Sequence, residues 1–434
     1  MTSTTADSTQ TSFWHPFADM SAVKSAEFVV DHAEDVWVWD RHGRRYLDGT
    51  ASLWYCNVGH ARPEIAAAIA AQLAKLEAYS AFGDFGNEPA TELARRLAGL
   101  APIRGAKVFF GSGGGDGIEI AAKLARRYFS AIGSPQRTMI LSRRNSYHGT
   151  HGFGTAIGGI EPNREGFGEL LVDSERVDRD DPDDLRRTIE RLGPDRVAAF
   201  FIEPVIGAGG VHPPATGYVE EIAEICASTG VLLVIDAVIC GFGRLGTWFG
   251  IERWGVEPDM IVFAKGVTSG YLPLGGTIIS ERIADPFWNG PGGLIFRQGA
   301  TYAGHATCCA AALANIDLLA GDGLLARGQE LEGELRSALE PLARHELISE
   351  LRGGTGLLAA LEINSDVLKR RPSAVADVFK GTREAGVLVR PLGSGIALSP
   401  PLTATPEHFQ IAAEAIGAGL DSLMSKLDAT PAAV

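Results

Sequence analysis

The chain has 434 residues and a net charge of −14 at pH 7. This length fits one large two-part globule or two to three modules, and 45% hydrophobic residues provide for a substantial core. An acidic chain without a basic stripe is a poor nucleic-acid binder. The sequence has no uninterrupted apolar run of about 20 residues, the length that a membrane span needs.

Five cysteines without framework spacing indicate a reducing compartment, because disulfide scaffolds use even, patterned sets. The segment Met1–Gln10 is rich in Ser and Thr and lacks the apolar core of a signal peptide. We therefore expect a cytoplasmic protein with a loose leader.

The first predicted elements are two short strands around a turn within Val36–Gly49, followed by helices over 61–76 and 87–100. The chain then alternates short apolar strands with amphipathic helices. The strands are predicted at 107–110, 197–203, 231–236 and 260–264, and the helices at 116–131 and 217–229. This alternation is typical of a mostly parallel sheet covered on both faces.

The pattern changes after Gly321. A long helix rich in Glu and Arg is predicted first, then strands at 356–363, 387–390 and 396–399 and helices at 374–384 and 406–426. We expect an α/β protein with a large domain over 61–323 and a smaller α+β domain over 324–434. An N-terminal segment, 1–60, is expected to join the smaller domain.

Three features follow strands of the predicted parallel sheet, at the edge where such sheets bind ligands. A glycine-rich loop, Gly111–Gly117, follows the first strand, Asp236 ends another, and Lys265 follows a third. The chain has only 8 lysines, and one at a buried strand end is desolvated, which lowers its pKa and frees the amine as a nucleophile. Taken singly, the loop is explained equally well as a tight turn, and each charge as a paired strand end.

Together the three features match the needs of pyridoxal phosphate. The lysine would form the Schiff base, the acid would keep the pyridine nitrogen protonated, and the loop would anchor the phosphate. The loop is not a dinucleotide fingerprint, because Asp116 stands where the third glycine is needed, and it lacks the Gly-Lys-Ser/Thr of a P-loop.

Four segments resemble class III, fold-type I aminotransferases, in particular the omega-aminotransferase branch: FFIEPVIGAGGVHPP, VLLVIDAVICGFGRLG, DMIVFAKGVTSGYLPLGG and TYAGHATCCAAAL. The resemblance runs from about Phe13 to about Leu423. It implies a mostly parallel seven-stranded sheet between helices, and pyridoxal 5'-phosphate as cofactor. It also implies a homodimer with shared active sites, and ping-pong transfer of an amino group from an amine or omega-amino donor to a keto acid such as pyruvate.

The resemblance also implies residue roles. Lys265 would be the Schiff-base lysine and proton shuttle, and Asp236 would hold the pyridinium N–H. The remaining cofactor contacts would be Gly114 and Gly115 at the phosphate, Tyr147 and Val238 on the two ring faces, and Thr301 from the neighbouring subunit. The substrate pocket would be lined by Trp54 and Tyr302, with Phe82 or Phe85 nearby. Ordinary core packing is the alternative for each of these aromatics.

The sequence departs from the family pattern at several positions. Where the family usually has Ser-Gly-Ser-Glu, this chain has Gly113-Gly114-Gly115-Asp116, so a serine hydroxyl bond to the phosphate is missing. A hydrogen bond is worth roughly 1 kcal/mol, so we expect weaker retention of the cofactor rather than its loss. Ala237 replaces the glutamate of the usual Asp-Glu-Val, a change for which we have no account.

Carboxylate recognition also departs from other branches of the family. Ala208 and Ala397 stand at the positions of a gate glutamate and its fixed arginine, which disfavours substrates like ornithine or 4-aminobutyrate. In the omega branch an arginine ten residues before a Pro-Pro pair meets the substrate carboxylate. Arg390 precedes the pair at Pro400 by that spacing, in a segment that we expect to be a flexible glycine-containing loop.

Other functions compete with transamination. His148 and His151 form only a weak metal pair, because no third ligand lies nearby in the sequence. An aminomutase, racemase or decarboxylase would use the same fold and cofactor. A cofactor-bound regulator or scaffold with degraded catalysis is a further alternative, which Ala237 and the altered glycine loop favour.

Overall fold

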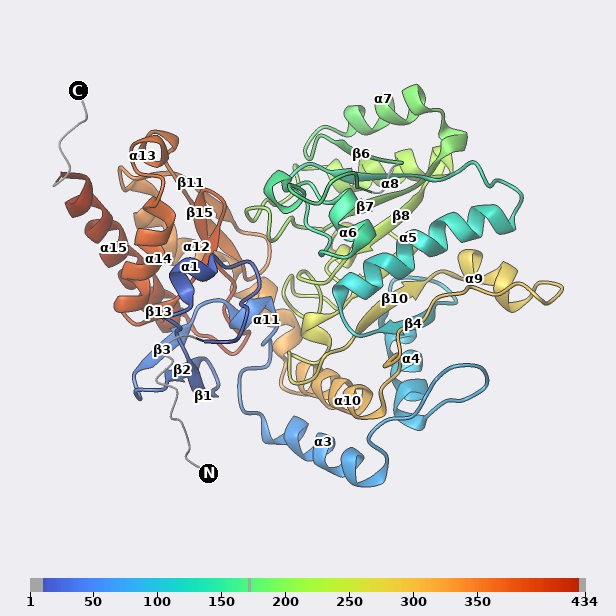
Figure 1. The fold of residues 1–434 in the computed structure, drawn as a ribbon, viewed down its shortest axis with the longest axis horizontal. Coiled ribbons are helices and arrows are strands. Elements are labelled where there is room, and N and C mark those ends of the chain that lie inside the picture. Colours follow the sequence, from blue (N-terminus) through green and yellow to red (C-terminus); the bar gives the residue numbers. More distant parts are fainter. Residues whose placement is uncertain (1–10, 171–172, 429–434) are drawn as a thin grey trace, which may run out of the picture.

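The computed structural model describes residues 11–170 and 173–428, and the expected leader lies outside them. Two lobes lie side by side, with the middle of the described chain in the larger lobe and its first and last elements in the smaller one (Figure 1). The larger lobe is built on a seven-stranded sheet in the order β4-β10-β9-β8-β7-β5-β6. Its strands are β4 (Lys107–Gly111), β5 (Met139–Arg143), β6 (Ser174–Val177), β7 (Val197–Ile202), β8 (Leu232–Asp236), β9 (Met260–Phe263) and β10 (Gly275–Ile279).

The sheet is mostly parallel, as the sequence predicts. Strands β6, β5, β7, β8 and β9 pair in parallel, and β10 runs antiparallel to both β9 and β4. The alternating side chains of the buried strands pack into two separate clusters, one on each face. The sheet is therefore the middle layer of the lobe.

Helices cover both faces of this sheet. Three of them contribute to the cluster on one face: α5 (Gly114–Ala131), α6 (Gly152–Ile157) and α9 (Glu281–Trp288). The other face is covered by α3 (Pro63–Lys75), α4 (Glu88–Leu100), α7 (Pro182–Leu192), α8 (Tyr218–Thr229) and α10 (Ala306–Gly321). Apolar residues at helical spacing supply the buried stripe of each helix.

The smaller lobe contains two four-stranded sheets, in the orders β1-β2-β3-β13 and β11-β12-β15-β14. The strands are β1 (Val30–Glu34), β2 (Trp37–Asp40), β3 (Arg45–Asp48), β11 (Ile348–Gly353), β12 (Ala359–Ile363), β13 (Val387–Leu388), β14 (Arg390–Leu392) and β15 (Gly395–Leu398). The helices of this lobe and its edges are α1 (Met20–Val23), α2 (Ala51–Trp54), α11 (Leu324–Glu330), α12 (Glu332–Leu339), α13 (Ser365–Arg370), α14 (Ala374–Glu384) and α15 (Pro406–Asp428).

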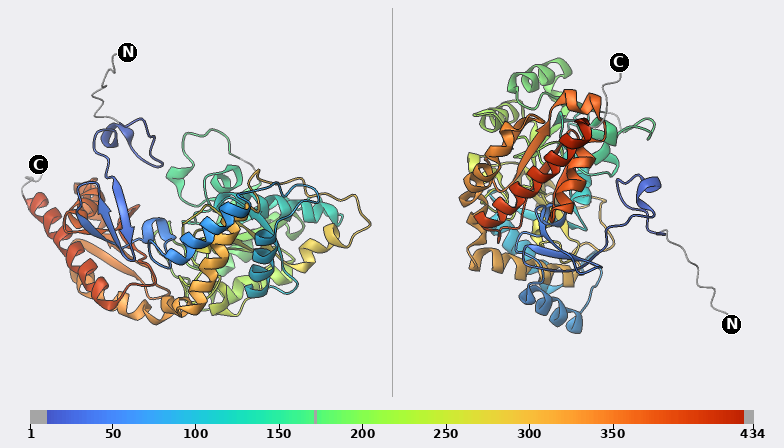
Figure 2. Two further views of the ribbon diagram at one scale, coloured as in Figure 1. Left: turned by 90° about the horizontal axis from the view of Figure 1, so that it is seen from below. Right: turned by 90° about the vertical axis from the view of Figure 1, so that its left-hand side faces the viewer.

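Strand β13 pairs in parallel with β3, so the N-terminal hairpin belongs to the same sheet as a C-terminal strand. Both views in Figure 2 show the N-terminal strands beside the C-terminal helices. This pairing supports, as a proposal, the division into residues 1–60, 61–323 and 324–434.

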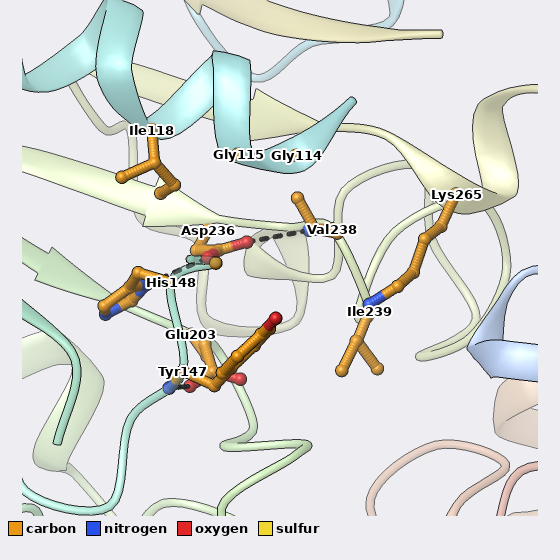
Figure 3. A pocket seen from close by; sticks show the side chains of 11 residues that line it. Gly114, Gly115, Ile118, Tyr147, His148, Glu203, Asp236, Val238, Ile239 and Lys265 are labelled. Carbon is orange, nitrogen blue, oxygen red and sulfur yellow. Dashed lines mark hydrogen bonds and ion pairs between the residues drawn. The ribbon is translucent and has the colours of Figure 1, made fainter. Parts of the chain in front are cut away.

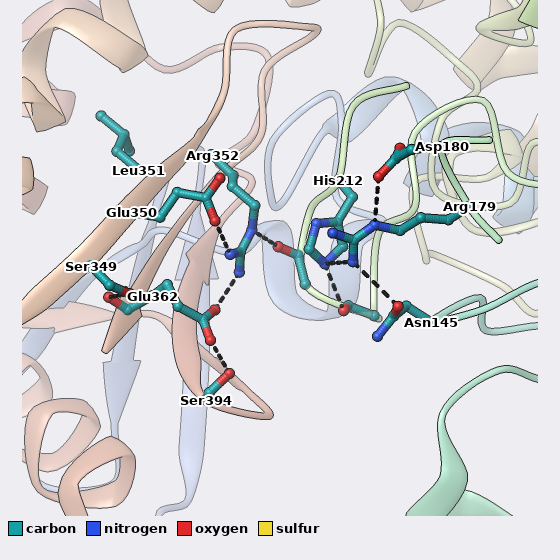
Figure 4. Close-up of polar contacts among 12 residues, drawn as sticks. Asn145, Arg179, Asp180, His212, Ser349, Glu350, Leu351, Arg352, Glu362 and Ser394 are labelled. Atoms are coloured by element: carbon teal, nitrogen blue, oxygen red, sulfur yellow. Dashed lines mark hydrogen bonds and ion pairs between the residues drawn. The ribbon is translucent and has the colours of Figure 1, made fainter. Parts of the chain in front are cut away.

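A polar network also joins the two lobes (Figure 4). Arg352 of β11 donates from Nε to the carbonyl of Gly210, in the loop that follows β7, at 2.8 Å. On the other side of that loop Arg179 lies 3.2 Å from Nε2 of His212. Burial, with the charges of Arg179 and Arg352, lowers the pKa of His212 to about 4, so its ring stays neutral near pH 7.

Two predicted elements differ from the structure. The single long helix expected after Gly321 is two helices, α11 and α12, which meet at Leu331. The carboxylate of Glu332, the first residue of α12, accepts hydrogen bonds from Arg253 and from the Gly356 amide, and these contacts fix the start of α12.

The second difference concerns Arg390, which begins strand β14 rather than a loop. Pro391 has no N–H to donate, but β14 is the edge strand of its sheet, where proline is tolerated.

Within the described residues no single helix is long and apolar enough to cross a membrane. Helices α10 and α11 pass that test only as a pair bent by 58°.

Candidate active site

Three neighbouring parallel strands carry chemically active side chains to one edge of the large sheet. Glu203 follows β7, Asp236 ends β8, and Lys265 lies two residues after the end of β9. All three line one cavity of about 190 Å³, together with the start of α5 and the segment around Tyr147. In Figure 3 the Lys265 and Asp236 side chains enter this space from adjacent strands.

Lys265 begins a short 3₁₀ turn with a φ of 46°, a strained value for a residue with a side chain. Gly266 allows this turn to pack closely, because a Cβ there would lie 2.7 Å from Nδ2 of Asn57. Burial lowers the pKa of Lys265 from 10.5 to about 8, although the carboxylates of Asp236 and Glu203 act in the opposite direction. At pH 7 about a tenth of the amine is therefore neutral, far more than for a lysine with a pKa of 10.5, and is available as a nucleophile.

Both carboxylate oxygens of Asp236 are held in place. Nδ1 of the buried His148 donates to Oδ2 at 2.9 Å, and the backbone N–H of Val238 donates to Oδ1 at 3.1 Å. Nε2 of His148 is buried without a hydrogen-bond partner among the described residues. This fixed carboxylate can hold a cationic N–H group in the cavity.

Glu203 is a site residue that the sequence analysis does not single out. Its buried carboxylate accepts hydrogen bonds from the backbone N–H groups of Tyr147 at 3.0 Å and Gly207 at 2.9 Å. Burial raises its pKa, and the charge of Asp236 acts in the same direction. The sequence signal that could have identified Glu203 is the one that identifies Asp236, an acid at the end of a near-continuous apolar strand.

The glycine loop lies at the N-terminus of α5, which begins at Gly114. A Cβ on Gly114 would lie 3.0 Å from a methyl group of Val238, so glycine lets the loop approach this wall of the cavity without displacing that side chain. Unpaired N–H groups at the start of a helix favour an anion. The lysine amine, the fixed carboxylate and this loop together fit pyridoxal phosphate, which needs a partner for its aldehyde, its ring nitrogen and its phosphate.

The structure brings together six of the predicted site residues and leaves the others apart. Those lining the Lys265 cavity are Gly114, Gly115, Tyr147, Asp236, Val238 and Lys265. Burial raises the pKa of the Tyr147 hydroxyl, and the charge of Asp236 contributes to the rise.

Arg390 lies outside the residues lining that cavity but near enough for its charge to act on Lys265 and Tyr147. Its Nε is buried without a hydrogen-bond partner among the described residues. Burial lowers the pKa of its guanidinium.

A second surface hollow, of about 430 Å³, holds Phe82, Thr301 and Tyr302, none of which lines the Lys265 cavity of the same chain. Phe85 is exposed and packs edge-on against Tyr79 at 5.5 Å between ring centroids. All four residues are accessible on the surface of the single chain.

Trp54 is buried, with 3% of its surface exposed. It belongs to an apolar cluster that includes Ile239, itself a lining residue of the Lys265 cavity. Trp54 is not among the residues that line the Lys265 cavity in this chain.

No group of three or more His, Cys, Asp or Glu side chains is arranged to hold a metal ion among the described residues. Of the two histidines considered for a metal pair, His148 bonds to Asp236 and His151 lies beside Asp116, with 3.7 Å between Nδ1 and Oδ1.

Comparisons with known proteins agree with this chemistry. Residues 20–420 match the family described as aminotransferase class-III. An omega-aminotransferase of Caulobacter vibrioides is 34% identical over 93% of this chain and 96% of its own length. A beta-alanine–pyruvate aminotransferase of Pseudomonas aeruginosa is 33% identical over 94% of this chain and 95% of its own length. The structure of a PLP-bound amine transaminase from an uncultivated Pseudomonas species superposes with a TM-score of 0.91 at 38% identity, covering 95% of this chain and 99% of that one.

Proposed function

The chain belongs to the class III aminotransferases, and we propose that it moves an amino group from an amine or omega-amino donor to a keto acid such as pyruvate. The observation that carries this proposal is the convergence of Lys265, Asp236 and the glycine loop on one cavity. The family implies pyridoxal phosphate as the cofactor. Pyruvate is proposed as the acceptor because the Pseudomonas aeruginosa relative is a beta-alanine–pyruvate aminotransferase.

When bound, pyridoxal phosphate supplies an electron sink that stabilises negative charge next to the substrate nitrogen. The role of the residues of this chain is to hold the cofactor and to move protons. Lys265 would hold the cofactor through its amine and would accept and donate a proton at Nζ, for which a pKa of about 8 suits work near neutral pH. Asp236 would keep the ring nitrogen of the cofactor protonated, and His148 fixes the orientation of that carboxylate.

Arg390 is proposed to bind the carboxylate of the keto acid. In the β14–β15 pair it lies directly opposite Ala397, the position at which other branches of the family carry a fixed arginine. Opposite residues of an antiparallel pair point to the same face, so the side chain of Arg390 lies on the same face of the sheet as that of Ala397. A guanidinium suits a carboxylate because it can donate two parallel hydrogen bonds.

We propose a homodimer in which Thr301, with Tyr302 and Phe82, completes the active site of the partner. The support is their exposure on a surface hollow separate from the chain's own Lys265 cavity. A cytoplasmic location is also a proposal. It is supported by the five cysteines, all of which are free thiols.

One assay separates the proposed function from its alternatives. The protein is incubated with pyridoxal phosphate, ¹⁵N-labelled β-alanine and pyruvate, and the alanine formed is analysed by mass spectrometry. Transamination predicts ¹⁵N-alanine, with Lys265→Met as an inactive control. A racemase or decarboxylase would convert its amino substrate without labelling pyruvate, and a scaffold would give no product. Absence of labelled alanine across a panel of amine donors and keto acids would refute the proposal.

A further inference from the structure

The glycine loop provides few hydrogen-bond donors for a phosphate. Its residues Gly113, Gly114 and Gly115 have no side-chain donors, and the next residue is the acid Asp116. Oδ2 of Asp116 accepts a hydrogen bond from the Ser112 N–H at 2.7 Å. The loop therefore contains a carboxylate, and one of its backbone N–H groups already has a partner. A phosphate monoester carries about 1.5 to 2 negative charges at neutral pH. Backbone amides beside a carboxylate are an incomplete set of partners for such an anion.

The imidazole of His151 occupies the space beside this loop. A Cβ added to Gly115 would have its three nearest neighbours in that ring, at 3.1 Å from Cε1 and 3.2 Å from each nitrogen. These distances are closer than ordinary van der Waals contact. The φ of Gly115 is not in the left-handed region, so the backbone does not require glycine there. A side chain at position 115 would therefore require the imidazole to shift by a few tenths of an ångström.

The His151 ring is also available to a ligand. Its Nδ1 lies 3.7 Å from Oδ1 of Asp116, and the side chain is 51% exposed. It makes no hydrogen bond within the described residues, whereas the other histidine of this segment, His148, is committed to Asp236.

We propose that His151 binds the phosphate of the cofactor, and that its imidazole replaces the side-chain donor that position 115 lacks. This inference rests on the proposed function, because it assumes that pyridoxal phosphate occupies the Lys265 cavity. Residues 115 and 151 then serve the same place: a side chain at 115 would crowd the imidazole of His151, and either residue can supply a donor to the same anion.

The test measures cofactor binding rather than turnover. Cofactor-free protein is titrated with pyridoxal phosphate to obtain a dissociation constant, and the ³¹P resonance of the bound cofactor is recorded. His151→Ala should raise the dissociation constant about tenfold, the loss of one charge-assisted hydrogen bond, and should shift the ³¹P resonance. His32→Ala is the matched control, because His32 is 58% exposed and also lies beside an aspartate, at 2.9 Å. It should change neither quantity.

A second substitution tests the exchange between the two positions. Gly115→Ser in the His151→Ala background should recover most of the lost affinity, because the ring that crowds a Cβ there is gone and the serine hydroxyl supplies a donor. His151→Gln, which keeps an N–H donor, should hold the dissociation constant within about threefold of the wild type.

The outcomes distinguish this inference from the proposed function. If the wild-type protein bound no pyridoxal phosphate, the proposed function itself would fail. If the wild type bound it and His151→Ala bound equally well, only the role of His151 would be overturned. Equal losses in His151→Ala, His151→Gln and the double variant would also overturn it, since they would indicate a packing role for the ring.

Discussion

Lys265 is expected to make the cofactor-free protein less stable than it would be without the lysine. Burial lowers the lysine pKa from 10.5 to about 8, so protonation is less favourable in the folded chain than in the unfolded chain. Each pKa unit corresponds to about 1.36 kcal/mol, so the full difference is roughly 3 kcal/mol. Because the cavity admits water, we expect Lys265→Met to raise the free energy of unfolding by roughly 1–3 kcal/mol near pH 7.

The sign of this effect depends on pH in a defined way. Below about pH 8 the lysine is protonated in both states, and the folded chain bears the whole cost of the buried charge. Between pH 8 and 10.5 the unfolded chain binds more protons than the folded chain, so the stability of the wild type rises with pH relative to Lys265→Met. Above pH 10.5 both states hold a neutral amine, and this contribution to the difference disappears.

Urea unfolding of both cofactor-free proteins at pH 7 and pH 10, at equal protein concentration, measures these differences. Lys75→Met is the matched control, because Lys75 is 67% exposed and its loss should change the free energy of unfolding by less than about 0.5 kcal/mol. A Lys265→Met protein that is less stable than wild type at pH 7, or equally stabilised at both pH values, would refute the reasoning. Loss of all transaminase activity in the same variant would show that this destabilising lysine is the functional one.

Three further predictions concern the site. Asp236→Asn should leave pyridoxal phosphate bound but slow the single-turnover reaction with an amine at least a hundredfold, because a neutral amide does not hold the ring nitrogen protonated; an unchanged rate would exclude this role. Arg390→Ala should raise KM for pyruvate by at least tenfold and leave the half-reaction with a carboxylate-free amine within about twofold; equal losses in both would indicate a structural arginine. Mixing Lys265→Ala subunits with Thr301→Ala subunits should produce heterodimers with one site that has wild-type cofactor affinity, if Thr301 serves the partner's site; no such site would appear if each Thr301 served its own chain.

The parts of the fold that the sequence predicts well are those that local pattern determines. Strands β7, β8 and β9 are near-continuous apolar runs, which only a sheet covered on both faces can bury. Strand β10 is not among the predicted strands, and its Gly275-Gly276 start has the composition of a turn. Those glycines are required by packing: a Cβ on Gly276 would lie 2.3 Å from the Phe109 carbonyl of the neighbouring strand β4. Such a contact depends on tertiary structure and leaves no local signal.

The same division holds for the candidate site. Asp236 and Lys265 are recognisable because a charge directly after a buried strand is unusual. Glu203 has the same signal but is not among the predicted site residues. The hydrogen bond between His148 and Asp236 has no local sequence signal, because it joins residues 88 positions apart in the chain. The position of Arg390 opposite Ala397 depends on the register of a short edge strand, which sequence spacing does not define.

The central claim is that the amino group is held on the protein between two separate half-reactions. Its most direct test is to mix the cofactor-loaded protein with an amine donor alone, remove the donor by gel filtration, and then add pyruvate. The account predicts that the donor bleaches the yellow absorbance with one equivalent of carbonyl product per Lys265 site, and that pyruvate then restores the colour with one equivalent of alanine. Alanine formed only when donor and pyruvate are present together, or no bleaching by any donor in a panel, would contradict it.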